Sequence, residues 1–265
     1  MVVRLAANLS FMFKELPFLQ RFGAARRVGF RATEFMFAGD SGYEHSALEV
    51  HEQLSLHGLQ HVLLNAPAGD WAAGERGVGG IPGRDAQFMA SIEDGLSFAA
   101  QVGCRKMHVM AGLVDHGADE DTFVERLRLG SVAAAEAGIC LCVEPLNSTN
   151  FPGYLIPDVA TALRIIEKVD APQCKLQLDL YHHAMTDPSA DLSEAIERLL
   201  PHAAHIQIAN PPNRNEPGVG EVDFAPLLSQ LETSEYDGYV GCEYKPSTPT
   251  TEGSLAWAHA YGIGA

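Results

Sequence analysis

The chain has 265 residues, of which 46% are apolar, enough to bury a substantial core. Its formal net charge is −16, which argues against a protein that wraps nucleic acid, since phosphate binding depends on clustered Lys and Arg. The sequence contains no run of about 18 apolar residues, so no membrane span is predicted. The N-terminal segment lacks the cationic start and the continuous apolar stretch of a signal peptide.

Short β-like runs alternate with longer helix-like runs along the chain, which is typical of βα units and a parallel sheet. Eight strands are predicted, at residues 3–8, 32–37, 60–65, 106–110, 139–144, 175–179, 205–208 and 240–243. Between them, a 3.6-residue period predicts helices over residues 17–28, 84–102, 119–137, 158–168, 192–200 and 224–233. Glycines that directly precede strands, such as Gly103 and Gly138, are expected as helix C-caps.

This order of elements favours a closed barrel. Eight strands with intervening helices in one chain of this length fit a (β/α)₈ TIM barrel, a fold of about 250 residues. The rival is an open doubly wound sheet, but no G-x-G-x-x-G motif follows the first strand and no Walker-type loop occurs. We therefore expect an α/β fold with a single domain over residues 1–265.

The cysteines predict a reducing compartment. They are odd in number, form no C-x-x-C pair, and mostly sit in or beside apolar, strand-like runs. Buried thiols of this kind are typical of cytosolic proteins, where disulfides are rare. We therefore expect a cytoplasmic protein with reduced thiols. The five are Cys104, Cys140, Cys142, Cys174 and Cys242.

The polar faces of the strands predict an active site inside the barrel. Side chains alternate across a strand, and a parallel barrel strand packs one face on helices and the other in the lumen. Burying several carboxylates without partners is strongly unfavourable, so a polar lumen indicates function and not plain packing. The polar side chains assigned to the lumen are Glu34, His108, Glu144, Asp179, His205, Gln207 and Glu243.

Four of these side chains fall at or near the carboxyl ends of consecutive strands. Glu144, Asp179, Gln207 and Glu243 belong to strands five to eight and are spaced by about one βα unit each. Active sites of such barrels are built at this end. Three carboxylates and one amide oxygen favour a hard divalent cation. We therefore predict a metal site made by the four side chains, with Mg²⁺ preferred and Mn²⁺ as the alternative.

Several motifs together resemble one family over nearly the whole chain. They are "AANLSFMF" (6–13), "NAPAGDWAAGERG" (65–77), "HVMAG" (108–112), "VEPLN" (143–147), "QLDLYH" (177–182), "HIQIANPPNRNEPGVGEVDF" (205–224) and "GCEYKP" (241–246). On these motifs the chain resembles the hydroxypyruvate isomerases, within the xylose isomerase-like TIM-barrel superfamily. The related 2-oxo-tetronate isomerases share most of the motifs.

The resemblance implies an isomerase that interconverts hydroxypyruvate and tartronate semialdehyde, a reaction of glyoxylate metabolism. Protons would move through an enediolate with the help of a metal. In the family, two glutamates act as acid and base and also bind the metal, and they match Glu144 and Glu243. The other two ligand positions match Asp179 and Gln207.

The resemblance also implies residues that bind the substrate, a small keto acid or sugar acid. His182 and Arg214 keep their places in the motifs, and we expect them to contact substrate oxygens or the carboxylate. Lys245, just beyond the eighth strand, is expected to do the same. Nucleic acid and membrane are not expected as partners, and assembly into a homo-oligomer is left open.

Three alternatives stay open. The same chemistry serves 2-oxo-tetronate isomerisation or ketose 3-epimerisation. A metal-dependent abasic-site endonuclease shares the superfamily barrel, but it predicts a basic groove and more metal ligands, and the net charge of −16 weighs against it. A non-catalytic barrel that binds sugar acids would keep its function after replacement of Glu144 or Glu243 by Gln.

Overall fold

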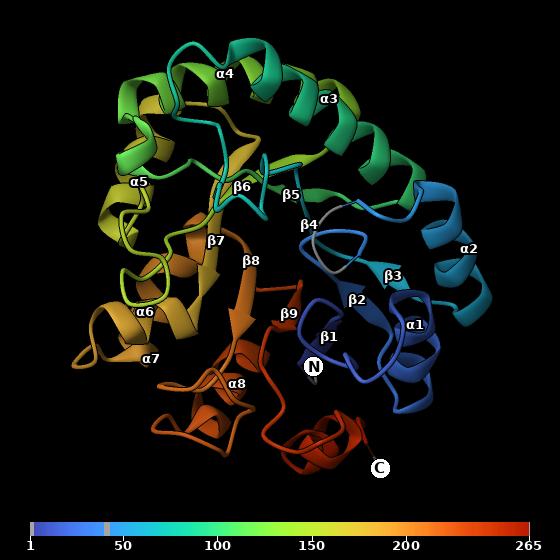
Figure 1. Cartoon of the computed structure of the whole chain (residues 1–265). Helices are drawn as coiled ribbons and strands as arrows, with labels where there is room; N and C mark the ends of the chain where they lie inside the picture. The colour runs from blue at the N-terminus through green and yellow to red at the C-terminus, as the bar shows by residue number, and fades with distance from the viewer. Residues whose placement is uncertain (1–2, 40–42, 265) are drawn as a thin grey trace.

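The computed structural model describes residues 3–39 and 43–264. Figure 1 shows the strands at the centre and the helices arranged around them, and the predicted TIM barrel is confirmed. All strand pairs are parallel, in the order β3-β2-β1-β9-β8-β7-β6-β5-β4. The strands are β1 Arg4–Asn8, β2 Ala32–Glu34, β3 Gln60–His61, β4 Leu64–Asn65, β5 Lys106–His108, β6 Cys140–Val143, β7 Cys174–Asp179, β8 Ala203–Ile208 and β9 Tyr239–Cys242.

The third predicted strand, residues 60–65, consists of two short pieces. β3 pairs with β2, whereas β4 pairs with β5. Between the pieces, the Val62 N–H donates to the Thr33 carbonyl at 2.9 Å, and the Leu63 carbonyl accepts from the Phe35 N–H at 3.3 Å. These hydrogen bonds hold the segment between β3 and β4 against β2 and the residue that follows it. Nine short strands therefore occupy the eight predicted positions.

The six predicted helices are confirmed, each to within one residue at either end. Glycine ends two of them as predicted, because Gly103 and Gly138 adopt φ values of 72° and 65°, which favour glycine. Every helix in the described ranges is too short or too polar to cross a lipid bilayer. The helices are α1 Phe18–Arg27, α2 Ala47–His57, α3 Asp85–Val102, α4 Glu120–Ala137, α5 Val159–Val169, α6 Leu180–Thr186, α7 Leu192–Leu199 and α8 Phe224–Thr233.

Two of these helices, α2 and α6, were not predicted from the sequence. Helix α2 begins with a capping box between Ser46 and Glu49, but Leu48 and Leu56 are exposed on it and blur its apolar period. Helix α6 has seven residues, which is too short for a clear period. It begins directly after β7, with the Asp179 side chain as its N-cap.

The apolar faces of the strands pack outward and the polar faces line the lumen, as predicted. Leu176 and Leu178 of β7 are fully buried in the apolar core between sheet and helices. The side chains of His205 and Gln207 on β8 are just as buried, but they face polar groups. Both contact the Glu34 carboxylate, and Gln207 also contacts Gln177. The strand alternation thus delivers polar groups to one interior space.

Candidate active site

A cavity of about 360 Å³ lies at the carboxyl ends of the strands, where the site was predicted. Asp179, which is 1% exposed, lies behind its wall and contacts two of the lining residues. Lys245 is exposed at the cavity. The other predicted site residues that line it are Glu144, His182, Gln207, Arg214 and Glu243.

Strand register brings the four predicted ligand residues to one end of the barrel. Asp179, the last residue of β7, pairs with Gln207 of β8, and Gln207 in turn pairs with Gly241 of β9. Glu144 and Glu243 directly follow β6 and β9. The four residues therefore lie at one end of the barrel, as the sequence predicted, while their roles as ligands and acid–base groups stay predictions.

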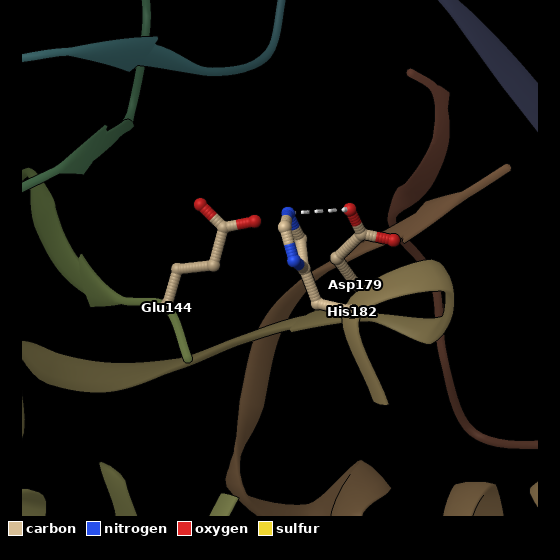
Figure 2. A group of neighbouring side chains, drawn as sticks. All are labelled: Glu144, Asp179 and His182. Carbon is tan, nitrogen blue, oxygen red and sulfur yellow. Dashed lines mark ion pairs between the residues drawn. The ribbon is translucent and has the colours of Figure 1, made fainter. Parts of the chain in front are cut away.

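Glu144, Asp179 and His182 form a tight cluster in which the side chains point toward one another (Figure 2). One potential ligand atom from each lies within 4.8 Å of the others. The Nε2 atom of His182 is 3.8 Å from Asp179 Oδ2. Glu144 Oε2 is 3.2 Å from Nδ1 of the buried His108, and Glu144 Oε1 has no hydrogen-bond partner among the described residues. The cluster therefore offers an orphaned acceptor to a ligand.

Arg214 supplies a positive charge to the acids of the site. Its Nη2 donates to Glu243 Oε2 at 2.8 Å and to Asp179 Oδ2 at 3.2 Å. Its Nε donates to the Glu243 carbonyl at 3.2 Å. The rings of Phe11 and Tyr181 lie 4.7 Å and 4.9 Å from the guanidinium carbon. Cation–π contacts of this kind hold the guanidinium beside both carboxylates.

A buried polar network holds the amide of Gln207. Its Oε1 accepts from Gln177 Nε2 at 2.7 Å, and its Nε2 donates to Glu34 Oε1 at 2.8 Å. The other oxygen of Glu34 is 2.6 Å from His205 Nε2, and Asn8 Nδ2 donates to Glu34 Oε1 at 2.9 Å. The sequence placed Glu34 and His205 in the lumen. In the structure they hold the side chain of a candidate ligand in one orientation.

Burial raises the pKa values of the acids in the site. For Glu144 the shift is large, and the charges of Glu243 and Asp179 add to the effect of burial. Burial raises the pKa of Glu243 to about 8, although Arg214 opposes the shift. Burial also raises the pKa of Asp179, again against the effect of Arg214. Three buried acids thus share one neighbouring arginine, and a further cation would relieve their repulsion.

The donor set fits a divalent cation. Carboxylate and amide oxygens are the ligands that Mg²⁺ and Mn²⁺ favour, and the repulsion among the acids supplies the electrostatic demand. The orphaned Glu144 Oε1 is a ready ligand atom. The residues that could hold such an ion are Glu144, Asp179, Gln207 and Glu243, with His182 as a further neighbour.

Sequence reasoning missed two residues that shape the site. Asn147 contacts His182, and Tyr181 covers one face of Arg214. Both lie inside motifs that carried the family resemblance, so a signal was present. Neither belongs to the inward face of a strand, which was the criterion that selected the acids.

Comparisons with known proteins show similarity over nearly the whole chain. Residues 22–261 match the xylose isomerase-like TIM barrel family. The chain is 41% identical to the 2-oxo-tetronate isomerase of Cupriavidus necator, across 97% of this chain and 98% of that one. It is 38% identical to the hydroxypyruvate isomerase of Escherichia coli, across 98% and 100%. A crystal structure described as an AP endonuclease of family 2 from Brucella melitensis has a TM-score of 0.92 at 42% identity, across 98% and 99%.

Replacement of Gly241 by Ala should disturb the network beneath the site. A Cβ atom at this position would overlap the Glu34 carboxylate. We expect Gly241→Ala to lower the free energy of unfolding by about 1–3 kcal/mol, the usual cost of overpacking a core. The control is Gly130→Ala in α4, where the added Cβ would meet Leu141 at an ordinary 3.4 Å. Urea denaturation measures both, and a Gly241→Ala protein as stable as the wild type would contradict the tight fit.

Proposed function

The chain belongs to the xylose isomerase-like TIM barrel family and is an isomerase of the hydroxypyruvate isomerase group, and we propose that it interconverts hydroxypyruvate and tartronate semialdehyde. The observation that carries the proposal is the pair Glu144 and Glu243. Both carboxyl groups are 5% exposed, line the same cavity and follow strands of the same barrel end. The second candidate substrate is 2-oxo-tetronate, which the 41% identity to a 2-oxo-tetronate isomerase favours.

The reaction moves a carbonyl group by one carbon. A proton leaves C3 of hydroxypyruvate, C2 gains a proton, and a hydroxyl proton passes from O3 to O2 by way of an enediolate. One of the two glutamates takes the carbon-bound proton and the other works as the acid. Burial raises the pKa of Glu144, and it raises that of Glu243 to about 8. Raised pKa values suit this work, because they make the carboxylate a stronger base toward a carbon-bound proton.

Glu144, Asp179, Gln207 and Glu243 would hold a divalent cation, Mg²⁺ in the first place and Mn²⁺ as the alternative. Bound there, the ion would supply positive charge to the substrate oxygens on which negative charge develops. The amide of Gln207 is already held by Gln177 and Glu34, so this candidate ligand needs little ordering when an ion binds.

Three cationic or donor side chains are assigned to the substrate. Arg214 lines the cavity and offers a planar group that can pair with a carboxylate. Lys245 adds charge at the same cavity, and His182, which also lines it, places a ring nitrogen between Glu144 and Asp179 (Figure 2). A small keto acid with a carboxylate at one end fits this combination of acids and cations.

The state of the cysteines supports a cytoplasmic location. The five cysteines are free, and four of them are buried, which suits a protein of the reducing cytoplasm.

A nuclease is the rival function from another class, because the Brucella melitensis structure is described as an AP endonuclease. The net charge of −16 opposes that rival, since a nucleic-acid groove requires a surface of clustered Lys and Arg. We therefore do not expect nucleic acid as a partner.

Replacement of either glutamate by glutamine should abolish most of the turnover. Glu144→Gln and Glu243→Gln keep the shape of the side chain but remove the proton carrier, so we expect kcat to fall about 10²–10⁴-fold. The assay follows hydroxypyruvate, 2-oxo-tetronate and a panel of ketoses, with circular dichroism to check folding. Glu136→Gln, at an exposed position of α4, is the control. Full turnover in either site variant would refute the assignment and favour a binding protein.

Removal of divalent metal should stop the reaction, and metal affinity should rise with pH. Because burial raises the pKa of Glu243 to about 8, the carboxyl group is mostly protonated below that pH, and an ion must displace the proton. We expect EDTA to abolish turnover and Mg²⁺ to restore it. Calorimetric titration of the EDTA-treated protein with Mg²⁺ should show tighter binding at pH 8 than at pH 6. An affinity that does not change with pH would contradict this account of the acids.

A further inference from the structure

His182 receives two hydrogen bonds on one ring nitrogen, Nδ1. The backbone N–H of Asn147 donates to His182 Nδ1 at 3.1 Å, and Asn147 Nδ2 lies 2.7 Å from the same atom. A backbone N–H can only donate. The Nδ1 atom must therefore present its lone pair, which means that it carries no proton.

The amide of Asn147 is itself fixed in one orientation. Its Oδ1 accepts from the backbone N–H of Asn150 at 2.9 Å, so the other amide atom, directed at His182, is the nitrogen. Asn147 Nδ2 also donates to Asn150 Oδ1 at 3.1 Å, and the Tyr181 hydroxyl donates to that oxygen at 2.7 Å. The backbone N–H groups of Asn147 and Asn150 thus determine which atom donates and which accepts in each of these hydrogen bonds.

A neutral imidazole with a bare Nδ1 carries its proton on Nε2. That atom is buried, has no hydrogen-bond partner among the described residues, and lies between Glu144 and Asp179 (Figure 2). Its distance of 3.8 Å from Asp179 Oδ2 is too long for a good hydrogen bond. The Nε2–H group is therefore a donor without an acceptor, on a side chain that lines the cavity.

We propose that Asn147 is a positioning residue that holds His182 as the Nε2–H tautomer, so that His182 donates to a substrate oxygen and is not a ligand of the cation. Ligation through Nε2 needs a lone pair on that atom, and the contacts of Asn147 keep the lone pair on Nδ1. Within the cluster, Glu144 and Asp179 would then be ligands of the ion, and His182 would donate a hydrogen bond to the substrate. The donor role rests on the proposed isomerase function, whereas the tautomer does not.

The tautomer can be observed directly by nuclear magnetic resonance. The whole protein is labelled with ¹⁵N-histidine, and long-range ¹H–¹⁵N spectra are recorded after EDTA treatment and again with saturating Mg²⁺. The signal of His182 is identified by its absence from the spectrum of His182→Gln. We expect a bare Nδ1 and a protonated Nε2 in both spectra. A proton on Nδ1, or loss of the Nε2 proton when Mg²⁺ is added, would overturn the proposal.

A pair of variants separates positioning from simple packing. Asn147→Asp places a carboxylate acceptor beside His182 Nδ1 while the backbone N–H stays, so the two groups make opposite demands on that atom. We expect a share of the rings to carry the proton on Nδ1 and kcat to fall about 10–100-fold, as for other residues that orient a functional group. Asn147→Ala keeps the backbone donor and should keep the Nε2–H tautomer. An Asn147→Asp protein with an unprotonated Nδ1 and full kcat would refute the role. Should this variant fail to fold, the wild-type spectrum decides.

The wild-type spectrum needs no substrate, so it tests the tautomer independently of the reaction. A chain that isomerises none of the tested acids would refute the proposed function and leave the tautomer unaffected.

Discussion

Mutual repulsion among three buried carboxylates is the constraint around which the carboxyl end of the barrel is organised. Glu144, Asp179 and Glu243 are each at most 5% exposed, and burial raises the pKa of every one. The guanidinium of Arg214 donates hydrogen bonds to two of the three, Asp179 and Glu243. Because one positive charge cannot balance three negative ones, the acids either keep protons or recruit a cation. The same repulsion therefore accounts for both the proposed proton transfer and the proposed metal site.

The lower lumen makes this arrangement of charges tolerable. Glu34 lies beneath the site and is fully buried, yet Asn8, His205 and Gln207 all contact its carboxylate, so it does not add an unpartnered charge to the site. Glycine is needed at position 241 of β9 because a Cβ atom there would overlap the Glu34 carboxylate. Hydrogen bonds thus extend upward from the barrel interior to the candidate ligand Gln207. The fold provides rigid support for side chains that would otherwise rearrange to escape one another.

Strand alternation explains why the acids could be predicted from the sequence and their neighbours could not. Glu144, Asp179, Gln207 and Glu243 occupy the inward phase at strand ends, and both features are visible in the chain. Asn147 lies in a loop, where no period exists, and its partner His182 is 35 residues away. Its role depends on which amide atom faces the ring, and this is set by the tertiary fold alone. Helix α2 escaped prediction for the opposite reason, since its exposed Leu48 and Leu56 obscure a period that exists.

The path of the carbon-bound proton tests the central claim most directly. If Glu144 and Glu243 carry protons between C3 and C2, a carboxyl group that has taken a proton can exchange it with solvent before returning it. Turnover of hydroxypyruvate in D₂O, followed by proton and deuterium magnetic resonance, should therefore place solvent deuterium on C2 of the product and on C3 of the recovered substrate. Product formed at the full rate with the original hydrogen retained and no solvent deuterium at either carbon would mean direct hydrogen transfer between the carbons, and would contradict a carboxylate proton pair.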